Sequence, residues 1–278
     1  MILLLLSAAA LAAEPGADGA SAAWAWLEGE PLYQLPLADT RSPLSHVTLR
    51  RDYATGVGEL LEFGKVIDAA IAAEIRIGEL SVAGWQVQPL ISAATFLGFR
   101  SEQELTFDLL TFDGYFGFPV DIRRDIWAAR FQWAHVSAHT ADGMRKVQPD
   151  PPIPEGAWSK EYWQLQGGPQ LDWWSAYGGV QLVTHSIHDS GRWGLQLGGA
   201  VEGPWAVAPY AAFDFKTQQT FDWAVTTSGQ IGARVDGERQ RIRLGLSYYR
   251  GLEDTGKLEG REERYLGLVL GLDTIGRL

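Results

Sequence analysis

The stretch Ile126–Gly143, IWAARFQWAHVSAHTADG, decides how the rest of the chain is interpreted. Successive side chains of an extended strand point to opposite faces, so alternate residues share a face. One face of this stretch carries aromatic residues and then a polar run: Trp127, Ala129, Phe131, Trp133, His135, Ser137 and His139. The other face carries Arg130 and Gln132 among small apolar residues. Moving a polar group out of water without a hydrogen-bond partner costs free energy. The environment of each face is therefore the central question.

The same alternation recurs along most of the chain. Residues 66–77 have an apolar face and a charged face, formed by Ile67, Ile71 and Ile75 and by Asp68, Glu74 and Arg76. This run is longer than the roughly 5–6 residues of an ordinary strand and is long enough for the roughly 9–11 residues of a strand that crosses a membrane. About twelve such segments lie between Val66 and Asp273, at the spacing expected of an antiparallel barrel.

The connections between these segments alternate in length. The short ones are residues 123–125, 168–171, 203–204 and 236–238, and the longer ones are residues 140–158, 186–191, 217–221 and 251–262. Outer-membrane barrels have short turns on one rim and long loops on the other, with aromatic girdles near both. We therefore predict an all-β fold, a closed antiparallel outer-membrane-type β-barrel of about twelve strands over residues 66–278. The alternative is a soluble all-β protein with a Trp-rich core.

The N-terminal part of the chain differs in composition. Residues 1–13, MILLLLSAAALAA, form a short apolar run that ends in small residues, which is typical of a signal peptide for export. This run is too short to span a bilayer, which takes about 20 residues. Residues 14–65 contain several prolines and should be irregular, lying at a barrel mouth or acting as a plug, with a short strand expected near residues 44–53.

Composition limits the partners of this chain. The formal net charge is -11, and a nucleic-acid partner would need clustered Lys and Arg. The absence of Cys excludes disulfides and thiolate chemistry. The prediction is a protein exported to the bacterial outer membrane, with membrane lipids as partners and no nucleic acid. Its oligomeric state is left open.

Several segments together resemble a known bacterial family. They are Asp108-Leu109-Leu110 to Phe118-Pro119, the run His135-x-Ser137-x-His139-x-x-Asp142, Ser159-Lys160-Glu161-Tyr162, Tyr177-Gly178-Gly179, the segment from Pro209-Tyr210 to Asp214, and Tyr248-Tyr249-Arg250-Gly251. The sequence resembles the family catalogued as domain of unknown function 1207 over roughly residues 36–273. That resemblance implies an exported barrel-like protein and no particular reaction.

A second resemblance is local. The His135-x-Ser137 pair on a lipid-facing strand is similar to the arrangement in outer-membrane phospholipase A and in lipid A 3-O-deacylase. Those enzymes place the pair near the outer rim, with an Asn or Glu about one strand away. This chain has no Asn, so the similarity implies that a third member would have to be acidic.

Ester hydrolysis requires a nucleophile, a base within hydrogen-bond reach and a group that orients the base. Residues i and i+2 of a strand project from one face, so His135 could serve Ser137 as a general base. Glu161 shares the outward face of the next segment with Trp163 and is the predicted third member. His139, Asp142 and Ser159 form a secondary polar cluster. No metal site is predicted, because His135 and His139, at positions i and i+4 of a strand, would be about 13 Å apart, which is too far for one ion.

Three functions stay open at this point. The first is a non-catalytic structural or lipid-interacting barrel, in which His135, Ser137 and Glu161 form a polar girdle at the level of the lipid headgroups. The second is a membrane-embedded serine hydrolase of phospholipid or lipid A acyl esters, for which calcium would be the one cofactor to consider. The third is a narrow pore lined by Asp68, Glu74, Arg76 and Arg130, with poor conductance because opposite charges pair across the lumen. Asp108 is expected to join the same inward charges in a lumenal charge network.

Overall fold

The computed structural model describes residues 23–26, 31–55, 66–103, 106–147, 156–187, 191–237, 240–253 and 256–274. The predicted signal peptide at residues 1–13 lies outside these ranges. The strands are β1 (Ala23–Trp26), β2 (Ser45–Thr55), β3 (Val66–Arg76), β4 (Gly78–Val82), β5 (Trp85–Gln103), β6 (Thr106–Arg124), β7 (Trp127–Thr140), β8 (Trp158–Pro169), β9 (Trp174–Ser186), β10 (Trp193–Glu202), β11 (Val207–Gln218), β12 (Val225–Asp236), β13 (Gln240–Leu252) and β14 (Glu262–Thr274). The helices are α2 (Asp142–Val147) and the 3-10 helix η1 (Gln219–Phe221).

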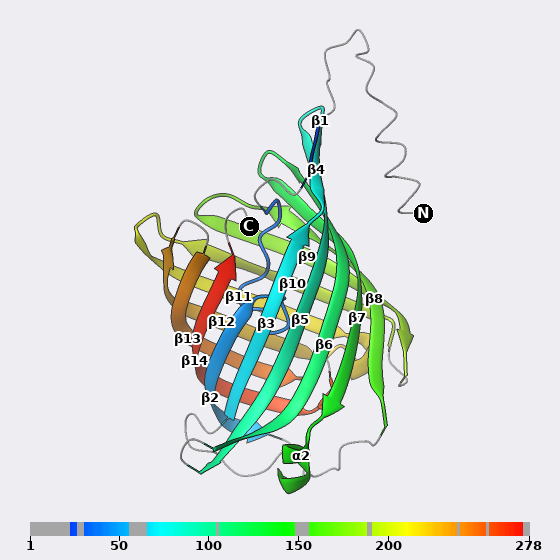
Figure 1. Cartoon of the computed structure of the whole chain (residues 1–278), viewed down its shortest axis with the longest axis vertical. Helices are drawn as coiled ribbons and strands as arrows, with labels where there is room; N and C mark the ends of the chain where they lie inside the picture. The colour runs from blue at the N-terminus through cyan, green and yellow to red at the C-terminus, as the bar shows by residue number, and fades with distance from the viewer. Residues whose placement is uncertain are drawn as a thin grey trace.

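Within the described residues, twelve strands close into an antiparallel barrel (Figure 1). The hydrogen-bonded order runs β5-β3-β2-β14 and then in descending order to β6, which pairs with β5 and closes the ring. The predicted fold class and strand number are confirmed. No helix in this part of the chain is long and apolar enough to cross a membrane.

The barrel begins earlier in the chain than the predicted boundary at Val66. β2 is a full wall strand that pairs with β14 on one side and β3 on the other. The short strand expected over residues 44–53 is therefore part of the ring, which could not close between β3 and β14 without it. β1 pairs with β4, which pairs with the first residues of β5 beyond the ring, so the segment expected to be irregular also contributes this small extension.

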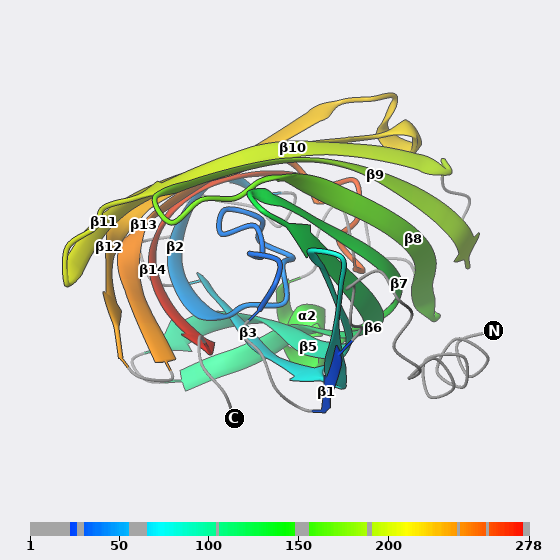
Figure 2. The same cartoon turned by 90° about the horizontal axis from the view of Figure 1, so that it is seen from above.

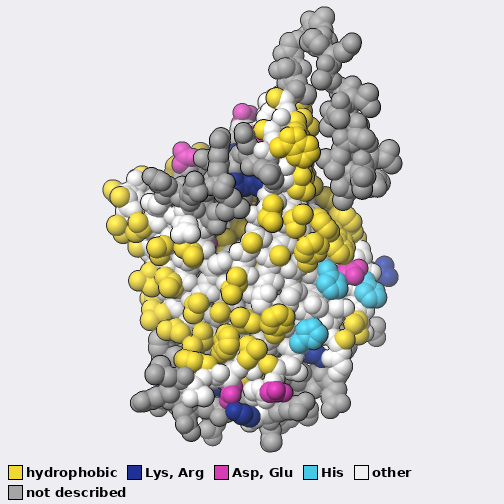
Figure 3. Space-filling model, viewed as in Figure 1, with side chains coloured by type: hydrophobic (Ala, Val, Ile, Leu, Met, Phe, Trp, Pro, Cys, Tyr) yellow, Lys and Arg dark blue, Asp and Glu magenta, His cyan; other side chains and the backbone are white. Residues whose placement is uncertain are grey.

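The barrel wall has its apolar face outside. Alternate leucines of β13 and β14 are exposed, among them Leu244 at 61% and Leu268 at 41% of their surface. Figure 3 shows hydrophobic side chains spread over the wall between the two rims. A soluble protein rarely exposes apolar patches of more than a few hundred Å². The outer wall is therefore suited to lipid, which contradicts the soluble alternative.

The interior of the barrel is polar and charged. Arg130 on β7 is 2% exposed and pairs with Asp121 (Nε–Oδ1 2.6 Å) and with Glu74 (Nη1–Oε1 2.7 Å). Asp68 pairs with Arg50 at 3.0 Å. Opposite charges thus pair among the inward side chains, as predicted for the lumen, both between neighbouring strands and, for Arg130 and Glu74, between β7 and β3, which β6 and β5 separate.

One predicted lumenal charge lies elsewhere. Asp108 accepts hydrogen bonds from Lys146 Nζ of α2 at 2.8 and 2.9 Å, and the lysine side chain is half exposed. β6 extends past the ring at the long-loop rim (the rim next to α2), so Asp108 meets the loop after β7 instead of the lumen.

Residues 31–44 lie inside the ring, where Figure 2 shows the blue segment that precedes β2. Leu32, Tyr33 and Ala38 are almost completely buried. This segment has no helix or strand. We call residues 31–44 the lumenal segment below.

Candidate functional site on the outer wall

The register of the wall strands sets two rows of outward side chains side by side. In an antiparallel sheet, directly paired residues project to the same face. The first row crosses six strands and consists of Ala73, Ala93, Phe116, His135, Glu161 and His185. The second row lies next to it toward the long-loop rim and consists of Ile71, Thr95, Gly114, Ser137 and Ser159. All three residues of the predicted triad fall in these two rows.

His135 and Glu161 meet directly across β7 and β8. His135 Nδ1 lies 3.4 Å from Glu161 Oε1, and the two side chains are 37% and 34% exposed. Figure 3 shows histidine side chains beside an acidic side chain on this face of the wall. A contact through Nδ1 leaves Nε2 of the imidazole available to a neighbouring hydroxyl, which is the arrangement that a general base needs.

Ser137 lies two residues beyond His135 on the same face of β7. Within the residues that the structure describes, no hydrogen bond joins Ser137 to His135. Its partner on β6 is Gly114, and a Cβ built on Gly114 would lie 3.5 Å from Ser137 Oγ. The missing side chain at Gly114 leaves the hydroxyl open toward β5 and β6.

A shallow groove of ≈ 440 Å³ continues from Ser137 and His135 along the outer wall. Its lining from β3, β5 and β6 is mostly of small residues: Ile71, Ala72, Ala73, Ala93, Ala94, Thr95, Gly114, Tyr115 and Phe116. Because larger outward side chains surround this area, the small residues leave a depression in an otherwise apolar surface. One end of the depression reaches the His135–Ser137 pair.

His185 is a residue of the first row that the sequence analysis did not select. It lies on β9 directly opposite Glu161, so this carboxylate stands between two histidines. β8 and β9 shift register between Glu161 and Tyr162, and Thr184 Oγ1 donates to the Glu161 carbonyl oxygen at 3.3 Å there. A β-bulge of this kind could not be located from the alternation of residue types.

The secondary polar residues do not gather around Ser137 as one cluster. Ser159 pairs with Ser137 in register, and His139 is exposed further along β7. Asp142, which was expected in a loop, is the first residue of α2. Among the described residues, no group of three His, Cys, Asp or Glu side chains is arranged to hold a metal ion.

Comparison with known proteins gives structural similarity without sequence similarity. No family model and no curated protein sequence matches the chain. The fold is similar to the crystal structure of the Salmonella typhi outer membrane phospholipase dimer with bound calcium, with a TM-score of 0.51, 10% identity and coverage of 89% of this chain and 95% of that one. Escherichia coli outer membrane phospholipase A has a TM-score of 0.49 at 10% identity, over 87% of this chain and 95% of that chain. At this identity the likeness shows the fold, and the resemblance to domain of unknown function 1207 stays a prediction.

Proposed function

We propose that this barrel lies in the bacterial outer membrane and hydrolyses acyl esters of membrane lipids with Ser137 as the nucleophile. The observation that carries the proposal is the His135–Glu161 contact on the lipid-facing wall, in the row next to Ser137. Placing a carboxylate and an imidazole on a largely apolar, lipid-facing surface costs free energy. Such groups are therefore usually kept for a function.

The proposed reaction uses these three side chains in succession. Ser137 Oγ attacks the acyl carbonyl carbon while its proton passes to His135 Nε2, and Glu161 stabilises the resulting imidazolium. The imidazolium then protonates the leaving alcohol, and the C–O bond of the ester breaks. Water, deprotonated by His135, then attacks the acyl carbon of the acyl-enzyme. The bond from this carbon to Ser137 Oγ breaks, the fatty acid leaves, and His135 returns the proton to Ser137 Oγ. The absence of a Ser137–His135 hydrogen bond among the described residues of the unliganded barrel is compatible with this role, because catalytic hydrogen bonds often form only when substrate binds.

Calcium accompanies the Salmonella typhi protein. The outward groups around Ser137 in this chain are the hydroxyl of Ser159, the carboxylate of Glu161 and the imidazoles of His135 and His139, and the described residues form no metal-binding cluster. This donor set does not fit calcium, which prefers several oxygen ligands. The proposed reaction therefore uses side chains of this chain alone.

The small-residue groove supports a lipid substrate. An acyl chain lying along Ala73, Ala93 and Gly114 would bring its ester to Ser137. The bilayer is as apolar as the groove, so the groove contributes shape and orientation instead of hydrophobic affinity.

Filling the groove should therefore select against long acyl chains. We expect Ala93→Leu to lower the hydrolysis of long-chain phospholipid roughly tenfold or more. The leucine side chain would occupy the space of the bound acyl chain, and steric conflict of this kind costs about 1–3 kcal/mol. Hydrolysis of a short-chain ester should change little. The matched control is Ala211→Leu, an outward alanine on β11. Equal losses for short and long chains in Ala93→Leu would argue against an acyl-chain groove.

Glu161→Gln should reduce the rate less than loss of the nucleophile does. The amide keeps the shape of the side chain but cannot stabilise the imidazolium. In a well-studied serine hydrolase, removing the acidic member of the triad lowers kcat by roughly two orders of magnitude less than removing the serine does. The measurement is kcat for phospholipid in mixed micelles. An unchanged kcat would remove Glu161 from the mechanism.

The second candidate is a non-catalytic barrel with a polar girdle. The absence of a Ser137–His135 hydrogen bond within the described residues favours it. Expression in a bacterial host, membrane fractionation and heat-modifiable gel migration test the location of the barrel. Fatty-acid release from vesicles, measured with calcium and with a chelator, then separates the candidates, because a girdle predicts no release under either condition.

A further inference from the structure

We propose that residues 31–44 are a displaceable plug in a pathway through the barrel for small polar solutes. This pathway is independent of the outer-wall site, because it runs through the lumen. The segment lies inside the ring (Figure 2), and Leu32, Tyr33, Ala38 and Ser42 are each at most 5% exposed.

The wall that faces the lumenal segment does not fill the lumen by itself. Ala38 packs against Ala200 of β10 and Ala212 of β11, and its carbonyl oxygen accepts a hydrogen bond from Ser228 Oγ of β12 at 2.6 Å. Inward side chains this small leave a space that the lumenal segment occupies. A barrel without a pathway would be expected to fill that space with larger wall side chains.

Two charged residues of the lumenal segment bind side chains of the wall and of the loop between β13 and β14. Asp39 accepts from Lys216 Nζ at 2.5 Å and from Gln196 Nε2 at 3.0 Å. Arg41 pairs with Asp113 at 3.0 Å and with Glu253 at 2.7 Å. Such contacts exchange readily with water once the segment moves, because charged groups regain their hydration.

Two buried hydroxyls of the lumenal segment lack partners. Tyr33 Oη and Ser42 Oγ have no hydrogen-bond partner among the described residues. A buried polar group left unbonded is destabilising by comparison with the same group in water. If the lumenal segment moved into water, both hydroxyls would gain hydrogen bonds to water. This lowers the free-energy cost of displacing the segment.

The remaining space beside the lumenal segment has a mixed polar and apolar lining. Cavities of ≈ 60, ≈ 90 and ≈ 130 Å³ flank the lumenal segment. Glutamines line the smallest one and hydrogen-bond to each other across the wall, as in Gln132 Nε2 to Gln164 Oε1 at 2.6 Å and Gln166 Nε2 to Gln196 Oε1 at 2.5 Å. These amides and the charged side chains of the same cavity, Asp39, Arg41, Arg130, Lys160 and Lys216, offer hydrogen-bond donors and acceptors, which suits small polar solutes.

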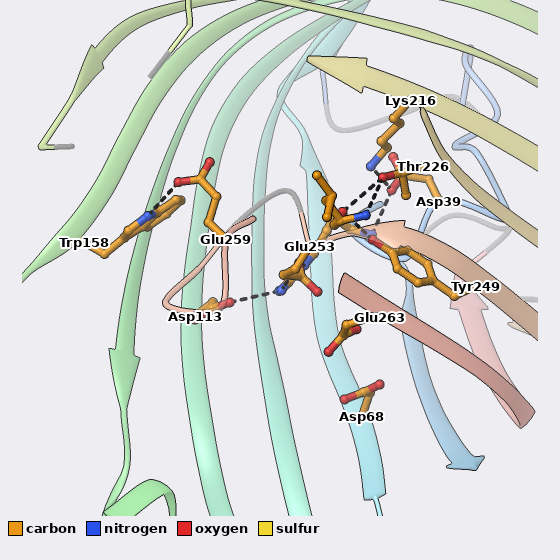
Figure 4. A network of polar contacts seen from close by, with 12 residues as sticks. Asp39, Asp68, Asp113, Trp158, Lys216, Thr226, Tyr249, Glu253, Glu259 and Glu263 are labelled. Atoms are coloured by element: carbon orange, nitrogen blue, oxygen red, sulfur yellow. Dashed lines mark hydrogen bonds and ion pairs between the residues drawn. The ribbon is translucent and has the colours of Figure 1, made fainter. Parts of the chain in front are cut away.

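The loop between β13 and β14 adds a second point of closure. Glu259 of this loop accepts a hydrogen bond from Trp158 Nε1 at 3.0 Å (Figure 4). It also accepts one from Lys160 Nζ at 3.0 Å, and Glu253 of the same loop binds Arg41. Arg41 thus joins the lumenal segment to the loop at the long-loop rim. Loss of Asp39 and Arg41 should release the lumenal segment from the wall and from this loop, while the Glu259 contacts of the loop remain.

The test is conductance in planar bilayers and glucose uptake in swelling liposomes. The intact chain should show no stable steps. Asp39→Ala/Arg41→Ala should raise the open probability by about two orders of magnitude, because each substitution removes charge-assisted hydrogen bonds. Lys146→Ala, which removes an exposed ion pair outside the lumen, is the matched control and should stay closed. Native heat-modifiable migration is checked for each variant, and Asp39→Asn alone replaces the double variant if that one does not fold.

A cysteine clamp distinguishes an opened plug from a damaged barrel. The chain has no cysteine, so Ala38→Cys/Ser228→Cys places the only thiols at a contact between the lumenal segment and the wall. In the Asp39→Ala/Arg41→Ala background, the oxidised clamp should block conductance and reduction should restore it. Equal conductance before and after reduction, or a folded double variant that stays closed, would overturn the proposal. Lipid hydrolysis should be unaffected throughout, so the outcome is separate from the fate of the proposed esterase.

Discussion

Ser137→Ala is expected to lower phospholipid hydrolysis by roughly four to six orders of magnitude, as loss of a catalytic serine does in serine hydrolases. The hydroxyl is the group that forms the acyl-enzyme. Thr95 and Ser159 of the same row also carry hydroxyls, but neither lies on β7 with His135. Stability should hardly change, since one small side chain replaces another on an outward position. The measurement is fatty-acid release from vesicles by equal amounts of folded barrel.

Ser159→Ala is the matched control for this prediction. Ser159 pairs with Ser137 in register and has the same chemistry and orientation, but it lies on β8. It should retain most of the wild-type rate. Equal losses in both variants would indicate a structural effect of outward hydroxyls, and an inactive wild type would leave the polar girdle as the function of the three residues.

Arg130→Ala is expected to destabilise the barrel by about 3–5 kcal/mol, the usual result of removing one partner from a buried ion pair. Arg130 pairs with Asp121, which is not exposed at all, and with Glu74 on β3. Without the guanidinium, two carboxylates face each other in the interior with reduced compensation. Urea unfolding in lipid vesicles, followed by Trp fluorescence, measures the change.

Lys146→Ala provides the comparison, because Lys146 and Asp108 form an ion pair near the rim whose lysine side chain is 54% exposed. An exposed pair typically contributes about 0–1 kcal/mol. A loss in Arg130→Ala no larger than in Lys146→Ala would mean that water reaches Asp121 in the variant and that the lumen is better hydrated than the burial of its charges indicates.

The site illustrates where prediction from residue order stops. Alternation places His135, Ser137 and Glu161 on the outward face, because the two-residue period of a strand is a local property. Which residues stand opposite each other depends on register, which is set by strand pairing and bulges. The bulge after Glu161 moves His185 into the same row, and no local pattern marks it.

The order of residues is enough to predict the class of fold, the apolar outside and polar inside of the wall, and the outward face that carries His135, Ser137 and Glu161. These follow from alternation, which reflects covalent geometry. Only the tertiary structure decided that β2 completes the ring, that Arg130 meets Glu74, and that Asp39 meets Lys216 far along the chain. Those contacts exist because closure of the barrel brings distant strands together around one lumen, and the energy of closure is shared among many residues.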